Sequence, residues 1–251
     1  MNYPKACMLV LLISSAIFIS CGTNPLSNDN PVIGTVKDID GNVYNTVRIG
    51  NQVWTVENLK TTKYNDGTSI PHVPGSGVYG ETTGWRNLQT GAYCYYDNNA
   101  SNKAKYGALY NWYAVNTGKL APKGWHIPTH EDWIELEEYL VANGYNWDGS
   151  KEINKIAKAL AAKTDWKFCT ASGFPGNDLS KNNRSGFSAL PGGYRDIVGD
   201  FHQQCDIGYW WCATESSAPR AWCRCLYSYI EYLSSIHYLV QNGFSVRLLQ
   251  D

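Results

Sequence analysis

The chain has 251 residues, of which 17% are charged and 14% aromatic, and its 21 basic residues nearly balance 22 acidic ones. Disordered chains are poor in aromatic residues, so this content indicates a chain that can build a hydrophobic core. The absence of a basic run argues against a nucleic-acid partner, because phosphate backbones are bound by clustered Lys and Arg.

The amino-terminal residues 1–20 predict an export signal. An apolar run of about 14 residues follows Lys5, which is shorter than the roughly 20 residues that a membrane span requires. Ser20 precedes Cys21, and a small residue before Cys at this place resembles the lipobox of bacterial lipoproteins, although Phe18 replaces the more usual Leu. We expect cleavage before Cys21 and lipidation of its thiol, with an ordinary signal peptide as the alternative.

The rest of the chain divides into a tether and one domain. Residues 21–33 are rich in Thr, Asn, Ser and Pro, a composition typical of a flexible tether. Residues 34–251 contain no second linker and no repeat, so we expect a single domain there.

The domain should open with a hairpin. Residues 35–39 and 43–49 alternate apolar and polar side chains around Asp40-Gly41, a strong turn pair, and residues 53–59 predict another strand. Residues 38–42 also resemble part of a calcium loop, but the closing Glu is missing and the turn is favoured. Asp97, Asn98 and Asn99 offer oxygen ligands to Ca²⁺, although a solvated or capping loop is the preferred interpretation. Calcium is thus the one cofactor left open.

Two helices are well marked and a third is expected. Thr129 can cap the first, with Asp132 three residues later, apolar residues Trp133, Leu136 and Leu140 on one face, and Asn143-Gly144 as the stop. The second is expected over residues 151–163, with Ile153, Ile156 and Leu160 on one face, and the third over residues 106–115. Short aromatic runs at residues 208–214, 221–229, 236–240 and 244–249 predict antiparallel strands, so the fold class is α+β.

Motifs for catalysis and metal binding are weak. Residues 75–80 match G-x-G-x-x-G, but no strand precedes and no helix follows them. His126 and His130 are separated by Pro128 and do not share a helix face, so no zinc site is expected. There is no nucleophile elbow, and we expect a protein that is not an enzyme and holds no metal.

Six cysteines remain outside the signal region: Cys94, Cys169, Cys205, Cys212, Cys223 and Cys225. Cys212 and Cys223 flank an expected turn at residues 214–220 and could face each other across a hairpin, with Cys225 on the face of Cys223. Free thiols are the preferred interpretation, disulfides the second, and a soft metal such as Cu(I) the third.

Eight phrases in one order carry a family resemblance over residues 34–251. They are residues 38–44, 49–54, 57–60, 91–94, 106–112, 121–129, 186–195 and 243–247, and together they resemble the Fibrobacter succinogenes major paralogous domain. That resemblance implies an exported or lipid-anchored bacterial protein with no settled activity. The closing phrases are also similar to the formylglycine-generating-enzyme branch of C-type lectin-like folds, which implies a C-type lectin-like domain with an N-terminal hairpin, two to three helices and a C-terminal twisted antiparallel sheet.

Residues 205–242 are rich in Cys, Tyr, Ser, Ile, His and Leu between fixed anchors such as Trp210 and Trp222. This pattern resembles the variable region of diversity-generating retroelement proteins, with ordinary drift in a surface sheet as the alternative. Tyr and Ser together supply rigid contact area and adaptable hydrogen bonding. The expected binding face consists of Arg220, Cys223, Cys225, Tyr227, Tyr229, Glu231, Tyr232, His237 and Tyr238.

The sequence therefore predicts a lipid-anchored, extracytoplasmic module that binds a protein or glycan. Its expected location is the bacterial cell envelope, at the outer membrane, with cell-surface display left open. Two alternatives stand beside it. One is a copper oxidase similar to formylglycine-generating enzymes, using Cys212, Cys223 or Cys225 as thiolates. The other is a purely structural envelope or adhesin component whose Trp and Tyr serve packing.

Overall fold

The computed structural model describes residues 32–75 and 84–251. The expected signal at residues 1–20, the lipidation site Cys21, nearly all of the tether and most of the glycine motif at residues 75–80 lie outside these ranges. Within them, no helix has both the length and the apolar character needed to cross a membrane.

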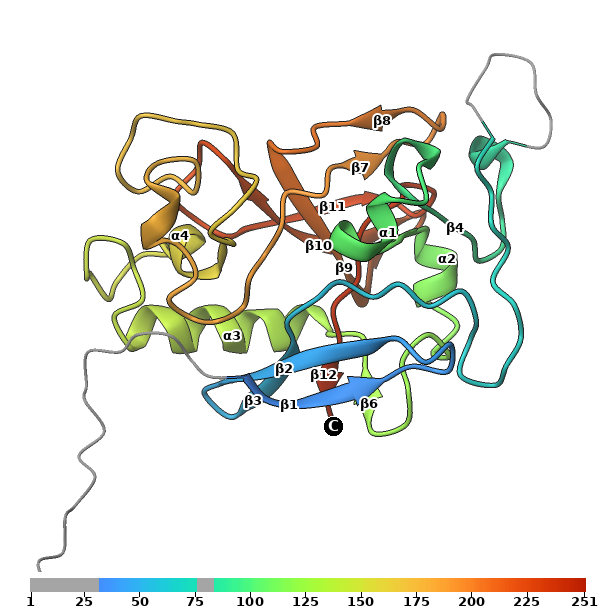
Figure 1. Ribbon diagram of the computed structural model, residues 1–251, viewed down its shortest axis with the longest axis horizontal. Helices are drawn as coiled ribbons and strands as arrows, with labels where there is room; N and C mark the ends of the chain where they lie inside the picture. The colour runs from blue at the N-terminus through green and yellow to red at the C-terminus, as the bar shows by residue number, and fades with distance from the viewer. Residues whose placement is uncertain (1–31, 76–83) are drawn as a thin grey trace, which may run out of the picture.

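One antiparallel sheet forms a layer at the bottom of Figure 1, with strand order β1–β2–β3–β12–β6. Its strands are β1 (Val32–Lys37), β2 (Val43–Ile49), β3 (Gln52–Thr55), β12 (Leu249–Gln250) and β6 (Trp125–His126). The predicted hairpin is confirmed: Gly41 N–H donates to the Asp38 carbonyl at 3.0 Å, and Gly41 has φ +84°, which favours glycine. The third strand is shorter than predicted.

The second sheet has the order β11–β10–β9, with β9 (Ile207–Ser217), β10 (Arg220–Tyr227) and β11 (Ser234–Leu239) all antiparallel. The predicted terminal strands are thus confirmed, although the β9–β10 turn is confined to Ala218-Pro219. The prediction of one continuous strand over residues 244–249 is wrong. Phe244 and Ser245 form isolated bridges with Tyr110 and Trp210, and β12 then joins the other sheet.

Short elements connect the two sheets. They are the paired strands β4 (Tyr93–Cys94) with β5 (Leu109–Tyr110) and β7 (Tyr194–Arg195) with β8 (Phe201–His202), the helices α1 (Asn102–Tyr106), α2 (Trp112–Val115) and α4 (Ala157–Leu160), and three 3-10 turns at Trp85–Asn87, Tyr96–Asn98 and Leu179–Lys181.

Two predicted helices are wrong over most of their length. In the 151–163 segment only α4 is helical, because the buried Asn146 side chain donates to the carbonyls of Ser150 and Ile153 and accepts from Lys155 N–H, which holds the segment as a loop. Ile153 is consequently 65% exposed. The 106–115 segment is interrupted at Gly107, whose φ of +77° and close approach to residues 58–59 exclude a continuous helix.

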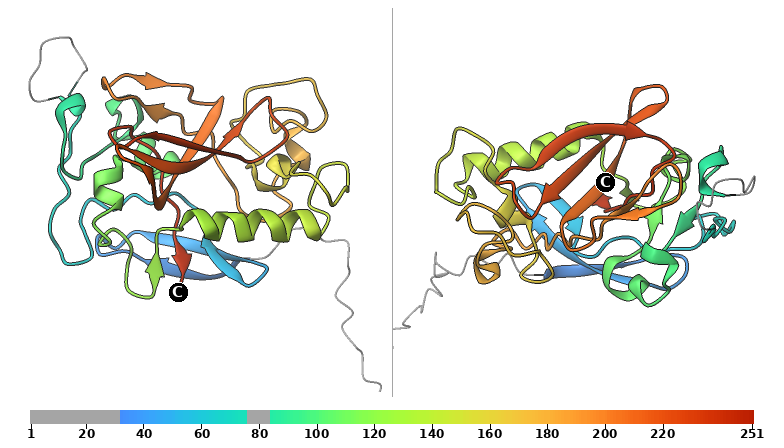
Figure 2. Two further views of the ribbon diagram at one scale, coloured as in Figure 1. Left: turned by 180° about the vertical axis from the view of Figure 1, so that it is seen from behind. Right: turned by 90° about the horizontal axis from the view of Figure 1, so that it is seen from above.

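The longest helix, α3 (His130–Ala142), lies between the two sheets, where it contacts β2, β9 and β10 (Figure 1; Figure 2, left). Its predicted capping box is confirmed: Thr129 Oγ1 accepts from Asp132 N–H at 3.2 Å, and Asp132 Oδ2 accepts from Thr129 N–H at 2.8 Å. Trp133, Leu136 and Leu140 are buried, as the helix stripe predicted. Few helices and mostly antiparallel strands confirm the α+β class.

The hydrophobic core occupies both faces of the β9–β10–β11 sheet. On one face, Trp210, Cys212 and Leu226 pack in the cluster that contains the α3 stripe. On the other face, the alternate side chains of β9 and β10, which point away from the first cluster, pack with Tyr110 and Phe244. Most of the sheet is therefore an interior layer, and solvent reaches its loops, its β11 edge and the ends of β9 and β10 beside their turn.

Candidate functional site

The expected binding face does not lie on one surface. Cys223 and Cys225 are fully buried at 0% exposure, against the prediction that they are accessible. The prediction failed because period-two alternation identifies two faces of a strand but does not reveal that both are covered.

Tyr227 and Tyr238 are half-buried and also contribute mainly to packing. Their rings lie 6.5 and 5.7 Å from the ring of buried Tyr209, and Tyr238 also meets Phe244 edge-on at 5.4 Å. Burial raises the pKa of Tyr209 far above its ordinary value. These contacts form an aromatic core. The prediction that Tyr227 and Tyr238 bind a ligand is therefore corrected: both residues serve mainly to pack the core.

The remaining predicted residues fall into two separate groups. Arg220 and His237 lie near the β9–β10 turn, whereas Tyr229, Glu231 and Tyr232 lie in the β10–β11 loop at the opposite end of β10. The eight residues of β10 span roughly 23 Å at about 3.3 Å per residue. The two groups are therefore separated by the length of β10, and the residues in the middle of that strand are mostly buried.

In the first group, His237 belongs to a stack of three rings. Trp222 lies between His130 of α3 and His237 of β11, with centroid separations of 4.3 and 5.4 Å and interplanar angles of 24° and 21°. Ser216 Oγ lies 2.9 Å from His237 Nδ1. Desolvation, with the neighbouring positive charge of Arg224, lowers the pKa of His130 and so favours its neutral imidazole. Trp222 is half-buried rather than a full core residue.

The second group is held on a fixed loop. Ser228 N–H donates to the Asp206 carbonyl at 2.8 Å at its start, and at its end Leu233 N–H donates to Asn154 Oδ1 at 3.1 Å. Asn154 Nδ2 donates back to the Leu233 carbonyl at 2.9 Å. Both ends of the β10–β11 loop are thus tied to the body of the domain.

An exposed tryptophan from another segment joins this loop. Trp147 Nε1 donates to Glu231 Oε2 at 2.6 Å, and Trp147, Tyr229 and Tyr232 are 42%, 43% and 46% exposed. We call these three side chains the aromatic rim. Trp147 is not among the site residues predicted from the sequence. Its polar neighbours in Asn146-Trp147-Asp148-Gly149 could have indicated that its ring is exposed.

The cysteines considered as alternatives for pairing or copper binding are dispersed. Cys212 and Cys223 lie on opposite faces of the sheet, and β10 pairs Cys223 with Trp211 rather than with Cys212. All six described cysteines are free thiols, and Cys223 and Cys225 do share one face, as predicted. Desolvation raises the pKa of Cys94 and Cys212 to about 12 and that of Cys225 to about 11, which disfavours the reactive thiolate.

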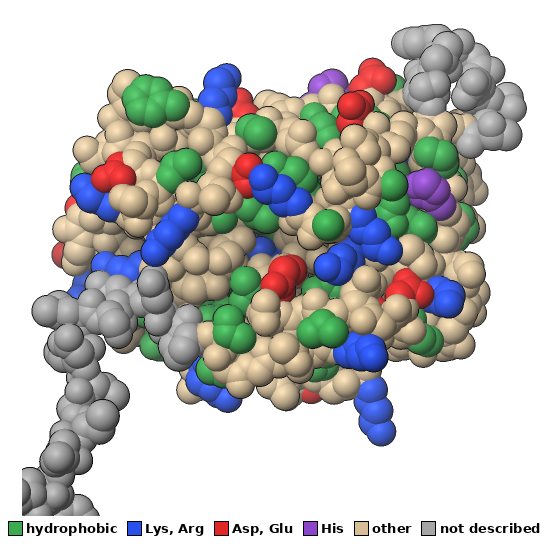
Figure 3. Space-filling model, in the orientation of Figure 1, with side chains coloured by type: hydrophobic (Ala, Val, Ile, Leu, Met, Phe, Trp, Pro, Cys, Tyr) green, Lys and Arg blue, Asp and Glu red, His purple; other side chains and the backbone are tan. Residues whose placement is uncertain are grey.

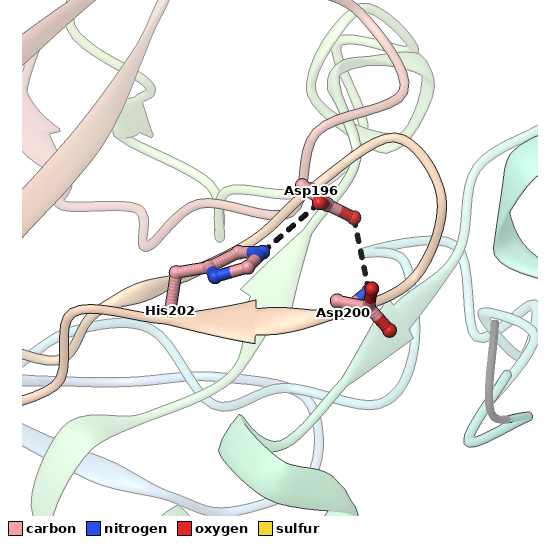
Figure 4. A group of neighbouring side chains, drawn as sticks. All are labelled: Asp196, Asp200 and His202. Atoms are coloured by element: carbon pink, nitrogen blue, oxygen red, sulfur yellow. Dashed lines mark hydrogen bonds and ion pairs between the residues drawn. The ribbon is translucent and has the colours of Figure 1, made fainter.

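One group of side chains in the described ranges has ligand atoms close enough to share a metal ion: Asp196, Asp200 and His202, all within 4.8 Å of one another (Figure 4). The Asp196 carboxylate already has a local role. Its Oδ1 accepts backbone N–H groups of Val198, Gly199 and Asp200, each at 2.9 Å, and its Oδ2 lies 2.9 Å from His202 Nε2. These bonds shape the β7–β8 hairpin.

The oxygen groups considered for calcium are also used by the fold. Asp38 accepts from Asn42 N–H at 2.9 Å and Asp40 from Thr62 Oγ1 at 2.8 Å, which supports the turn interpretation. Asp97 and Asn98 adopt left-handed backbone conformations in a 3-10 turn. His126 and His130 point to different partners, Asp132 and Trp222 respectively.

Comparison with known families gives one match. The model of the Fibrobacter succinogenes major domain matches residues 47–250, which covers most of the described chain. No curated protein and no solved structure matches.

Proposed function

The chain belongs to the Fibrobacter succinogenes major domain family, and from this premise we propose that it is an extracytoplasmic module that binds a protein or glycan ligand through the aromatic rim. The observation that carries the proposal is the rim itself. Three large aromatic side chains are about half-exposed: Tyr229 and Tyr232 lie on a loop anchored at both ends, and Trp147 is hydrogen-bonded to Glu231 of the same loop. Rigid aromatic rings lose little conformational entropy on binding and offer large amphipathic contact areas.

The rim also carries polar groups that suit recognition. The Glu231 carboxylate orients the Trp147 indole, and the hydroxyls of Tyr229 and Tyr232 make no hydrogen bond to another described residue. They are thus available to a ligand. Such a mixture of ring faces and unused hydroxyls fits both a peptide surface and the alternating apolar and hydroxylated faces of a sugar.

We further propose that the domain is held at the bacterial envelope by a lipid on Cys21. The apolar run before Ser20-Cys21 supports this arrangement, as does the tether-like composition of the residues between Cys21 and β1, which begins at Val32 inside the predicted tether of residues 21–33. The tether would separate the aromatic rim from the bilayer and leave it open to ligands. The same proposal has three further parts. The protein is located at the outer membrane, its fold is similar to lectin-like folds, and residues 205–242 are diversified by a retroelement. Diversification would fit the exposed loop better than the buried Cys223 and Cys225.

A glycan array and a panel of immobilised envelope proteins test the binding proposal on the full chain in mild detergent, with and without Ca²⁺. The double variant Tyr229→Ser/Tyr232→Ser should lose most binding, since truncating a central aromatic contact costs roughly 2 kcal/mol or more. Tyr139→Ser is the matched control, because Tyr139 is 36% exposed on α3, away from the β10–β11 loop.

Both variants should melt within a few degrees of the parent, since the substituted side chains are partly exposed. If no protein or glycan binds in either calcium condition, or if Tyr139→Ser weakens binding as much as the double variant, the aromatic rim is not the binding surface.

A further inference from the structure

A cavity of about 280 Å³ opens beside the aromatic rim. Ligand pockets in proteins usually measure roughly 300–1,000 Å³, and this cavity, just below that range, has room for a molecule no larger than a single sugar ring. Its walls come from the segment after α3, from α4, and from the loops around residues 172–184. The lining residues are Tyr145, Asn146, Trp147, Lys158, Ala159, Ser172, Asn177, Lys181 and Arg184.

The charge of this lining has one sign. Lys158, Lys181 and Arg184 are basic, and the lining contains no Asp or Glu. Lys181 has a carboxylate partner outside the lining, Asp178, at 3.2 Å. Basic side chains are visible over the loops around α4 in the space-filling view (Figure 3). Asp178 balances part of this positive charge, and a small concave site whose lining carries three basic and no acidic side chains still attracts anions.

Lys158 supplies a fixed charge at the wall of the cavity. It is only 5% exposed, and its ammonium group donates to the carbonyls of Phe174, Asn177 and Asp178. No carboxylate of the described residues lies within ion-pair distance, and desolvation lowers the pKa of Lys158. A bound anion would offset part of this desolvation.

Arg184 provides the directional group. Its guanidinium stacks 4.6 Å from the centre of the Tyr145 ring, and one Nη2–H donates to the Gly144 carbonyl. The other N–H donors of this guanidinium have no acceptor among the described residues. A planar guanidinium held by stacking, with donors to spare, suits two-point pairing with a carboxylate.

The aromatic wall and two hydroxyls complete the site. The Trp147 indole is fixed by its bond to Glu231 and by Gly173, where any Cβ would collide with the indole ring. The hydroxyls of Tyr145 and Ser172 make no hydrogen bond with another described residue. An indole face packs against the C–H face of a pyranose ring, and unused hydroxyls can bond to the ring's own hydroxyl groups.

We propose that this cavity binds a carboxylated sugar, such as a uronic acid unit of an acidic glycan. Arg184 pairs with the carboxylate, Trp147 lies against the sugar ring, and Tyr145 and Ser172 bond to hydroxyls. This inference rests on the proposed binding function and narrows its ligand from a protein or glycan to an acidic glycan whose neighbouring units contact the aromatic rim.

Calorimetric titration of the full chain in mild detergent tests the proposal with three probes: glucuronate, glucose and acetate. Glucose has the ring without the charge, and acetate has the charge without the ring. Glucuronate should bind at least tenfold more tightly than either. Equal binding of glucose, equal binding of acetate, or no binding of glucuronate would overturn the proposal.

Variants test the assigned roles. Arg184→Gln should weaken glucuronate binding at least tenfold, and Arg184→Lys should weaken it less, because the charge is kept without the planar fork. Arg48→Gln, at an exposed arginine of β2 in the other sheet, is the matched control and should bind like the parent. If Arg184→Gln is indistinguishable from Arg48→Gln, the cavity is not the site.

A further comparison separates this inference from the proposed function. Tyr229 and Tyr232 do not line the cavity, so Tyr229→Ser/Tyr232→Ser should change the dissociation constant for free glucuronate less than twofold. Rim-dependent binding of another ligand, with no glucuronate binding, would reject the cavity assignment alone. If neither glucuronate nor any rim-dependent ligand binds, the proposed binding function is rejected as well.

Discussion

Buried arginines hold distant segments of the domain together. Arg247 is 1% exposed and donates to Asn58 Oδ1 at 2.7 Å and to the carbonyls of Thr55, Phe187 and Ser188 at 2.7, 2.9 and 3.1 Å. Arg195 is 0% exposed, and its guanidinium lies between the rings of Trp85 and Phe201. Arg195 and Arg247 are the last residues of two sequence segments that carry the family resemblance, residues 186–195 and 243–247. The role of these two arginines is therefore to hold the fold together rather than to bind a ligand.

His126 should make stability depend on pH. Its hydrogen bond with Asp132, at 3.3 Å, is the largest cause that raises its pKa, and Asp251 lies 2.7 Å from its other ring nitrogen. A pKa raised on folding stabilises the native state below the ordinary value of about 6.5, and this contribution is lost as the pH rises through the folded-state pKa.

Thermal melts of the parent and His126→Gln at about pH 5.5 and pH 8 measure this effect. The parent should be the more stable of the two at the lower pH, and the difference should shrink at the higher pH. Because the ring is 38% exposed, solvent screening keeps the difference to about 1 kcal/mol or less. His72→Gln, at an exposed ring without a carboxylate partner among the described residues, is the control. An equal pH dependence in His126→Gln and the parent would contradict the assignment.

At the scale of elements, α3 supplies the central contacts of one core cluster. Leu136→Ala should lower the free energy of unfolding by roughly 2–5 kcal/mol, because Leu136 is fully buried between the two sheets. Ile134→Ala, on the same helix at 37% exposure, should cost much less. Urea denaturation of both variants measures the difference. Similar losses in the two would mean that the α3 orientation is wrong.

The sequence predicted the elements whose local chemistry agrees with their surroundings. Thr129 and Asp132 cap α3, and Asp40-Gly41 turns the first hairpin, because each depends on residues within a few positions. The segment at residues 151–163 shows the limit: it has helical spacing, but the bonds of Asn146 hold most of it as a loop. The aromatic rim was half predicted, since Tyr229 and Tyr232 follow from composition while the proximity of Trp147 depends on tertiary structure.

For the whole molecule, the proposed anchor makes a prediction independent of the fold. A palmitate analogue should label the wild type in bacterial cells, and labelling should be lost in Cys21→Ala, because no other thiol follows the apolar run in the position for lipid transfer. Ser20→Ala, which keeps a small residue before Cys21, is the control and should be labelled normally. Unchanged labelling of Cys21→Ala would refute the anchor.

The position of β12 has a consequence for biogenesis. Leu249–Gln250 lies between β3 and β6 and pairs with residues that precede it by more than one hundred positions (Figure 1). The five-stranded sheet therefore lacks an inner strand until every other element has been synthesised. Pairing between such distant segments slows folding, because a long loop must close before the contacts form. An incomplete chain leaves β3 and β6 without the strand that joins them, so we expect their unpaired edges to be open to association until β12 has been synthesised.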